Sequence, residues 1–233
     1  MANEQTSYSA VTCVNCNLDK LCIPKGLDPS DVGELALRVN RNNIRQKGEV
    51  IYHAGSTFRG IVALRSGSAK LLSYDGDGNE LIVDFILPGE LLGFDGFAKQ
   101  THNCTAIALE TVNFCHLPAY RLDMLVGNTS NLSHILLQRS CDQFDFQVQK
   151  ALFNRRTAEE RVAYFIVALS DRLKLRGYSE MEFRFSMSRE EIGNYLGITQ
   201  ETVSRIFHHF QAMNMIEIKA KRLKIIDKKK LSS

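Results

Sequence analysis

The spacing of apolar positions changes twice along this chain of 233 residues. Within residues 28–39, capping residues and a proline precede apolar positions at helical spacing, which predicts a short helix. Within residues 48–117 the apolar positions form short runs, and beyond Pro118 the helical spacing returns. The pattern therefore predicts a β-rich unit followed by a mostly helical one.

The β-rich region consists of short apolar runs separated by turns that contain glycine. Regular short strands of this kind are typical of a compact antiparallel barrel or roll. The runs that predict strands are residues 50–52, 61–64, 69–72, 81–86 and 105–108.

A long helix is predicted within residues 130–154, where one apolar stripe alternates four- and three-residue steps. This spacing indicates a coiled-coil seam of about two heptads, through which the helix would pair with its own copy. The stripe consists of Leu137, Cys141, Phe144, Val148 and Ala151. Alternatively, the stripe packs on its own barrel. A second set of apolar positions on this helix favours packing there by another face: Leu136, Phe146, Leu152 and Phe153.

A helix-turn-helix is predicted at residues 188–206. Ser188 and Glu191 form a capping-box pair at the start of a helix. The motif needs a small residue where its helices touch, a turn residue with positive φ, and apolar residues that close the far side. The chain has Gly193, Gly197, Ile198, Val203 and Ile206 at these positions.

The second helix of this motif would place polar side chains in the major groove of double-stranded DNA. Arg205 suits guanine, Glu201 suits the amino group of cytosine, and Gln200 and Ser204 lie on the same exposed side. Residues 216–219 and 223–226 then predict the two strands of a wing. For each residue alone, the alternative is a surface group on an amphipathic helix.

The charge distribution agrees with a DNA-binding C-terminal part. The net charge is +3, but residues 1–154 carry 13 Lys and Arg against 16 Asp and Glu, whereas residues 155–233 carry 16 against 10.

No run approaches the ~20 apolar residues of a membrane span, and the first ten residues lack a secretory pattern, so a cytoplasmic location is expected. No P-loop, nucleophile elbow or metal-hydrolase pair occurs, so an enzyme is not expected.

Three of the six cysteines crowd together as Cys13-x2-Cys16-x5-Cys22. Iron-sulfur clusters and structural zinc usually take four ligands, so a distant cysteine, Cys104 or Cys115, would have to complete such a site. The spacing alone leaves a cluster, zinc, redox thiols and buried cysteines open.

Several separated motifs together resemble the fumarate and nitrate reduction (FNR) regulators, the oxygen-sensing branch of the cyclic-AMP-receptor (CRP) superfamily. The resemblance extends in order over nearly the whole chain. The motifs are Cys22-Ile23-Pro24, Gly93-Phe94-Asp95, Leu109-Glu110-Thr111, Cys115-His116-Leu117-Pro118, Ala158-Glu159-Glu160-Arg161 and Ile192-Gly193-Asn194-Tyr195-Leu196-Gly197.

The resemblance implies a [4Fe-4S] cluster on Cys13, Cys16, Cys22 and Cys115, with no need for Cys104. It further implies a homodimer when the cluster is intact, and dissociation when molecular oxygen converts the cluster to a [2Fe-2S] form. DNA sites would be inverted repeats of the TTGAT type, and the turn at residues 74–80 would be one contact with RNA polymerase.

The implied fold is α+β, with an antiparallel β-roll of the cyclic-nucleotide-binding jelly-roll type, a long dimerisation helix and a C-terminal winged helix-turn-helix. The expected divisions are residues 1–27 for the cluster-binding segment, 28–128 for the roll, 129–157 for the dimerisation helix and 158–233 for the DNA-binding domain.

Three rival functions are weighed against this expectation. A cyclic-nucleotide sensor needs an arginine for the phosphate, but no arginine occurs between Arg65 and Arg121, which leaves Glu90 as a turn residue. A haem sensor for nitric oxide or another gas would use His53, His102 or His116 as axial ligands. A non-enzymatic interaction protein with structural zinc is the third alternative.

Overall fold

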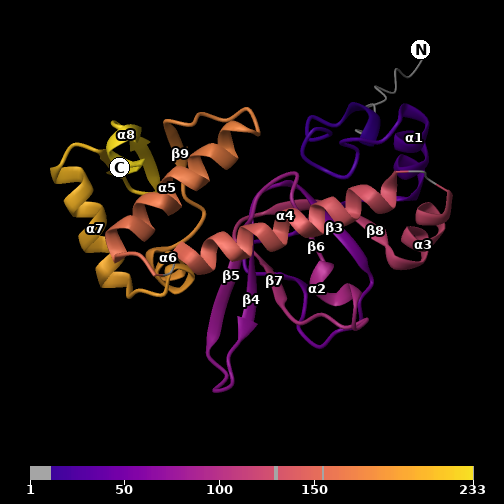
Figure 1. Cartoon of the computed structure of the whole chain (residues 1–233), viewed down its shortest axis with the longest axis horizontal. Helices are drawn as coiled ribbons and strands as arrows, with labels where there is room; N and C mark the ends of the chain where they lie inside the picture. Colours follow the sequence, from indigo (N-terminus) through magenta and orange to yellow (C-terminus); the bar gives the residue numbers. More distant parts are fainter. Residues whose placement is uncertain (1–11, 129–130, 154, 233) are drawn as a thin grey trace, which may run out of the picture.

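The computed structural model describes residues 12–128, 131–153 and 155–232 (Figure 1). The first ten residues, for which no secretory pattern is expected, lie outside the described residues, as do residues 129, 130 and 154 of the predicted dimerisation helix. The predicted α+β fold is confirmed: an antiparallel roll, a long helix and a C-terminal helix-turn-helix follow one another.

Within the described residues, the roll contains two four-stranded antiparallel sheets, ordered β1-β8-β3-β6 and β2-β7-β4-β5. The core residues between the sheets include Leu64, Ala69, Ala106 and Val112, each at most 1% exposed. The strands are β1 (Asn40–Arg45), β2 (Val50–Tyr52), β3 (Gly60–Ser66), β4 (Ala69–Tyr74), β5 (Glu80–Ile86), β6 (Leu91–Leu92), β7 (Thr105–Ala108) and β8 (Val112–Pro118).

The five predicted strands are confirmed, whereas β1, β6 and β8 were not predicted as separate strands. β1 reads Asn-Arg-Asn-Asn-Ile-Arg, which has little apolar alternation to indicate a strand. It forms because its backbone pairs with β8, with Ile44 opposite Asn113. β8 is in turn paired with β3, so it lies inside the sheet and carries Cys115 at its middle, opposite Ala63.

Of the helices in the N-terminal part, α1 (Pro29–Arg38) and α3 (Ala119–Asn128) lie together at one end of the roll (Figure 1). α1 confirms the predicted short helix and buries Leu35. A single 3-10 turn, η1 (Cys13–Asn15), precedes it, and α2 (Phe94–Phe97) and α3 flank the sheets.

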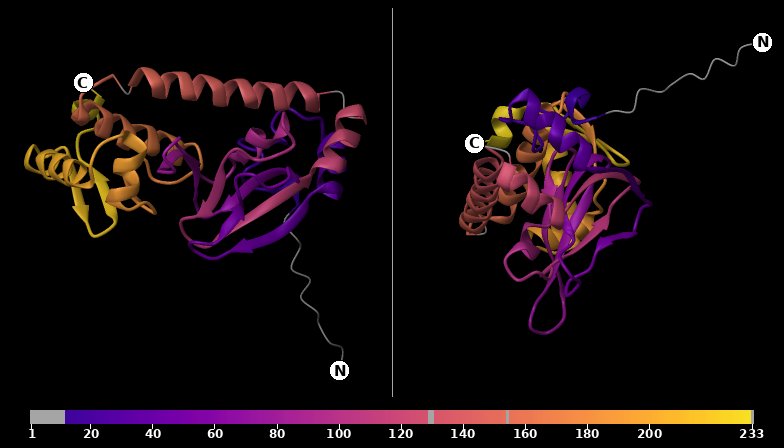
Figure 2. Two further views of the ribbon diagram at one scale, coloured as in Figure 1. Left: turned by 90° about the horizontal axis from the view of Figure 1, so that it is seen from below. Right: turned by 90° about the vertical axis from the view of Figure 1, so that its right-hand side faces the viewer.

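The long helix α4 (Leu132–Phe153) connects the two halves of the molecule. It runs along the length of the molecule, from the end that holds α1 and α3 to the C-terminal domain (Figures 1 and 2). Near its start, Leu132 and Ile135 are buried, and Leu136 packs against the same apolar cluster as Leu35. The predicted packing of one face on the roll is therefore confirmed for Leu136.

The C-terminal domain is a winged helix-turn-helix. Its first helix starts at a capping box in which Thr157 and Glu160 each accept the other's backbone N–H. The predicted wing hairpin is confirmed as β10 and β11, which are joined to β9 in one sheet. The elements are α5 (Ala158–Lys174), β9 (Glu182–Arg184), α6 (Arg189–Leu196), α7 (Gln200–Ala212), β10 (Ile216–Lys219), β11 (Arg222–Ile225) and α8 (Lys228–Ser232).

Candidate functional site

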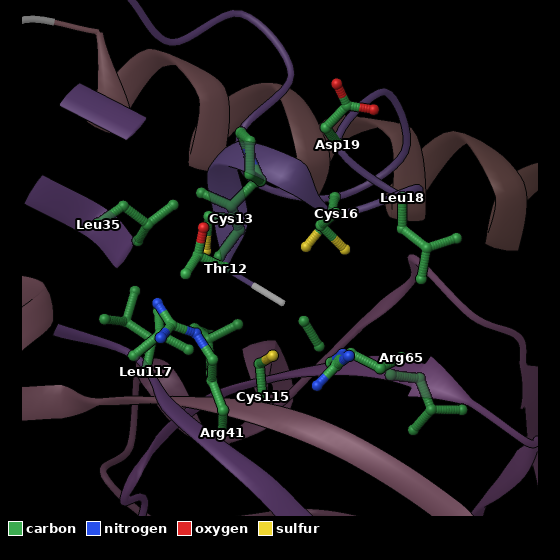
Figure 3. Close-up of a pocket in the computed structure, with 17 residues that line it drawn as sticks. Thr12, Cys13, Cys16, Leu18, Asp19, Leu35, Arg41, Arg65, Cys115 and Leu117 are labelled. Carbon is green, nitrogen blue, oxygen red and sulfur yellow. The ribbon is translucent and has the colours of Figure 1, made fainter. Parts of the chain in front are cut away.

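Four cysteines line one cavity between the N-terminal segment and the roll (Figure 3). Cys13 begins η1, Cys16 ends it, Cys22 follows in the next turns, and Cys115 reaches the same cavity from β8. Cys104 does not line this cavity. It lies just before β7, where its backbone N–H donates to Asp95 at 3.0 Å. The structure thus gathers the four predicted ligands and places Cys104 elsewhere.

Burial dominates the electrostatics of these thiols. It raises the pKa of Cys22 to about 12, and the charges of Cys13, Cys115 and Cys16 add to the effect. It likewise raises the pKa of Cys115 to about 11, where Arg65 acts in the opposite direction. Burial also raises the pKa of Cys13, although Arg41 acts in the opposite direction, so these three thiols ionise more readily when a cation is close by.

The rest of the cavity wall is largely apolar, with a few charged groups among it. The cavity itself is small, with a volume of about 40 Å³, and it is partly open to solvent. Leu18, Leu35 and Leu117 contribute apolar surface, and Arg41 and Arg65 reach the cavity from β1 and β3 (Figure 3). In the part of the chain that the structure describes, no group of three or more His, Cys, Asp or Glu side chains could hold a metal ion.

Helices α6 and α7 form the predicted helix-turn-helix. Ser188 accepts the backbone N–H of Glu191 at 3.1 Å, and the Glu191 carboxylate accepts that of Ser188 at 2.7 Å. A Cβ added to Gly193 would lie 2.7 Å from the carbonyl oxygen of Ile198, and Gly197 has a φ of +64°. Both glycines therefore have the roles predicted for them.

The recognition helix α7 separates its polar and apolar side chains. Thr199 caps its first turn, and Val203 and Ile206 are buried in the domain core. Gln200, Glu201 and Arg205 are exposed, while Ser204 is half-buried. The predicted DNA-contacting residues thus lie near the N-terminal end of a firmly packed helix.

Arg189 is a candidate DNA contact that was not predicted. Its guanidinium carbon lies 3.8 Å from the centre of the Phe207 ring, and burial lowers its pKa to about 10. Among the described residues, no carboxylate pairs with Arg189. The sequence signal was its place directly after the cap Ser188, because the N-terminal end of a helix favours anions such as the phosphate groups of DNA.

The five predicted seam positions on α4 are all exposed. Leu137 and Phe144 are 64% and 68% exposed, Val148 is 39% exposed, and Cys141 and Ala151 also face solvent. The alternative that this stripe packs on its own roll is therefore wrong for the single chain. Leu152 was expected among the positions that pack on the roll, but it is 58% exposed, because it lies four residues after Val148 and so close to the seam face of the helix.

Two of the three histidines named as possible haem ligands contact other protein groups, and the third is exposed. His102 is buried, stacks on Tyr52 with ring centres 3.9 Å apart, and lies 3.3 Å from an oxygen of Asp95. Nε2 of His116 lies 3.1 Å from the carbonyl oxygen of Arg59, and burial lowers its pKa. His53 is exposed.

Glu90 was interpreted as a turn residue, and its backbone N–H does close a turn on the carbonyl oxygen of Leu87 at 3.1 Å, but its side chain has a further role that was not predicted. Its carboxylate is 2.5 Å from Nη2 of Arg172 and 2.6 Å from Nη2 of Arg176, both on or just after α5. The sequence suggested no partner because the two arginines follow more than 80 residues later.

Residues 74–80, the predicted contact with RNA polymerase, form an exposed turn. No helix within the described ranges is long and apolar enough to cross a membrane.

Family models match both halves of the chain. The Crp-like helix-turn-helix domain matches residues 160–233, and the cyclic nucleotide-binding domain matches residues 45–128. The solved structure of FixK2 from Bradyrhizobium japonicum has the same fold, with a TM-score of 0.77 and 23% identity, and covers 83% of this chain and 96% of that one.

Curated relatives align over nearly the full length. The transcriptional activator protein Anr of Pseudomonas protegens is 40% identical, over 95% of this chain and 91% of that protein. The fumarate and nitrate reduction regulatory protein of Yersinia pestis is 37% identical, over 95% and 89%. The anaerobic regulatory protein of Haemophilus influenzae is 38% identical, over 96% and 87%. With its roll, connecting helix and helix-turn-helix, the chain belongs to the CRP/FNR family of DNA-binding transcription regulators.

Proposed function

We propose that this protein is an oxygen-responsive transcription regulator that holds a [4Fe-4S] cluster on Cys13, Cys16, Cys22 and Cys115. The observation that carries the proposal is the meeting of these four thiols at one cavity, although Cys115 is distant in sequence. A cubane cluster takes a thiolate at each of its four iron corners, so its ligands surround a cavity instead of converging on one ion. The four cysteines of the cavity lining provide one thiolate for each corner.

The donor set suits such a cluster for two reasons. Burial raises the pKa of Cys13, Cys22 and Cys115, so a metal centre would favour their thiolate form, and Arg41 and Arg65 in the cavity lining would balance part of the negative charge. When bound, the group supplies an iron-sulfur centre that molecular oxygen can oxidise. The chain's part is to hold the N-terminal segment against β8 and α4, where Arg139 donates to the carbonyl oxygen of Cys22 at 3.3 Å.

Homodimerisation through α4 is the second part of the proposal. The exposed stripe from Leu137 to Ala151 has coiled-coil spacing and no cover within the described chain, and we assign a second copy of the chain to it. Since α4 also contacts the cysteine segment through Arg139, a change in that segment would alter the pairing surface.

A two-fold dimer would present two α7 helices to DNA. Arg205 would contact guanine, Glu201 would accept from cytosine, and Gln200 and Ser204 would contact neighbouring groups at each half of a TTGAT-type inverted repeat. The exposed turn at residues 74–80 would contact RNA polymerase. A cyclic-nucleotide function is not favoured, because no arginine occurs between Arg65 and Arg121 to bind the phosphate, and Glu90 already pairs with Arg172 and Arg176.

The proposal is tested with full-length protein purified without air. We expect iron and acid-labile sulfide in equal amounts, broad charge-transfer absorption, and specific binding to a TTGAT inverted-repeat duplex that air abolishes. A sharp Soret band would indicate haem instead, and colourless protein containing zinc would support the structural alternative.

Cys115→Ala should abolish the cluster absorption while the protein still folds, because one corner of the cluster loses its thiolate. Cys104→Ala is the matched control and should retain iron, since Cys104 lies outside the cavity. Iron analysis and visible absorption of both variants decide the matter. The reverse result would make Cys104 the fourth ligand.

A further inference from the structure

Arg41 reaches the cysteine cavity with a donor that it does not use. Its Nε is buried and has no hydrogen-bond partner in the described chain, whereas its Nη2 donates to the carbonyl oxygen of Ala36. The latter contact fixes the guanidinium at the cavity wall beside Cys13 (Figure 3). A buried N–H without an acceptor is costly in a folded protein. Nε of Arg38 and Nε of Arg161 also have no partner in the described chain, but of the three arginines only Arg41 lines the cysteine cavity, where it favours the thiolate of Cys13.

A second cation lines the same cavity. Arg65 extends from β3 toward Cys115, and its Nη1 lies 3.3 Å from an oxygen of Asn42 (Figure 3). The charged groups of the cavity lining are therefore Arg41, Arg65 and the carboxylate of Asp19. The two cations outnumber the single acid, so this lining is prepared for an anionic occupant.

We propose that Arg41 donates its Nε–H to a sulfur of the cluster and its thiolates, and that Arg41 and Arg65 together set the reduction potential and the air stability of the centre. The inference rests on the proposed [4Fe-4S] function and assigns a role to two residues outside the four ligands. Hydrogen bonds to sulfur and nearby positive charge both favour the more electron-rich state of an iron-sulfur centre. Loss of an electron to molecular oxygen is correspondingly disfavoured.

Two substitutions separate the contributions of Arg41. Arg41→Lys keeps the positive charge but loses the Nε–H, whereas Arg41→Gln loses the charge as well. Arg45→Gln is the matched control, because Arg45 lies on the same strand β1, donates to the carbonyl oxygen of Val50, and does not line the cavity.

The experiment measures the midpoint potential for one-electron reduction by dithionite, and the loss of visible absorption after exposure to air, in full-length protein purified without air. We expect Arg41→Gln to have a lower potential and to bleach several-fold faster, Arg41→Lys to lie between it and the wild type, and Arg45→Gln to match the wild type. Arg65→Gln should shift the potential in the same direction as Arg41→Gln.

Unchanged potential and bleaching in Arg41→Gln and Arg65→Gln would overturn the proposal, as would equal shifts in Arg45→Gln. If Arg41→Gln does not fold by circular dichroism, Arg41→Lys and Arg65→Gln decide it by the same measurements. Wild-type protein without iron would instead refute the proposed function itself, and it would do so before any variant is compared.

Discussion

Asp84 and Glu90 are buried acids beside the same arginine, yet their pKa values shift in opposite directions. Burial raises the pKa of Asp84 to about 6, since Arg172 approaches it only to 3.9 Å and the charge of Glu90 opposes its ionisation. Burial acts on Glu90 as well, but the charges and hydrogen bond of Arg172, with the charge of Arg176, outweigh it and hold the pKa of Glu90 below its usual value. The arginines therefore outweigh burial at Glu90, whereas the attraction of Arg172 is too weak to do so at Asp84.

Asp84 predicts a pH dependence of stability. Its pKa is about 6 when folded and near 4 when unfolded, so between these values the folded state binds more protons and loses stability as the pH rises. The expected loss from Asp84 is about 2–3 kcal/mol. Asp84→Asn should remove it, and urea unfolding between pH 4 and pH 7 measures the effect.

Glu90 contributes to the pH dependence with the opposite sign. Its lowered pKa gives stability that is present above its usual pKa and is lost as the pH falls through the folded value. The loss of unfolding free energy at low pH that Glu90 causes should therefore persist in Asp84→Asn. If the free energy of unfolding of Asp84→Asn still decreases as the pH rises from 4 to 6, the assignment of this effect to Asp84 is contradicted.

Two glycines in helices predict opposite responses to the same substitution. A Cβ at Gly193 of α6 would meet the carbonyl oxygen of Ile198 at 2.7 Å, whereas a Cβ at Gly33 of α1 would meet no atom within 4 Å. Gly193→Ala should lower the free energy of unfolding by about 1–3 kcal/mol through overpacking. Gly33→Ala should raise it by about 0.5–1 kcal/mol through helix propensity. Chemical denaturation of both variants checks the pair, and equal effects would show that the close contact is not real.

The exposed stripe of α4 predicts that self-association depends on Phe144. Phe144→Ser removes a large apolar side chain from the centre of the seam in both copies, so the dissociation constant of the dimer should rise about tenfold or more. Gln149→Ser is the control, because Gln149 is exposed and lies away from the stripe. Sedimentation velocity of air-free protein measures the change. An unchanged dimer would place the interface on another surface.

At the scale of elements, local patterns predicted what depends on neighbours in sequence. The cap at Ser188, the turn at Gly197 and the start of α1 all follow from short-range chemistry, and each was predicted. β1 could not be predicted, because its polar residues form a strand only through pairing with β8. The partnership of Cys115 with the N-terminal cysteines came from the family resemblance, since spacing alone left Cys104 equally open.

The whole molecule is joined across its two halves by a polar interface as well as by α4. Lys70 of β4 pairs with Glu191 of α6 at 2.9 Å, and Lys150 of α4 bridges the two halves, because its Nζ donates to the carbonyl oxygen of Val83 at 2.7 Å and lies 3.8 Å from the centre of the Tyr195 ring. The side-chain oxygen of Asn194 accepts the backbone N–H of Ile82 at 2.7 Å. Together with the arginines at Glu90, these contacts hold the helix-turn-helix in one orientation on the roll, while the Gln200 end of α7 remains exposed.

Glu90→Gln should loosen the attachment of the DNA-binding domain to the roll. The variant leaves Arg172 with only the more distant carboxylate of Asp84 and removes the carboxylate partner of Arg176, which is only 3% exposed, so a cost of about 3–5 kcal/mol is expected at this interface. Hydrogen exchange should accelerate in α5 near Arg172 more than in the core strands of the roll, because α5 loses its anchor.

Glu49→Gln makes the same chemical change at an exposed site on the roll and should leave exchange in α5 unchanged. If Glu90→Gln also leaves it unchanged, the apolar contacts and α4 suffice to hold the two halves together. If both variants accelerate exchange in α5 equally, the effect is a general loss of stability and not the release of this interface.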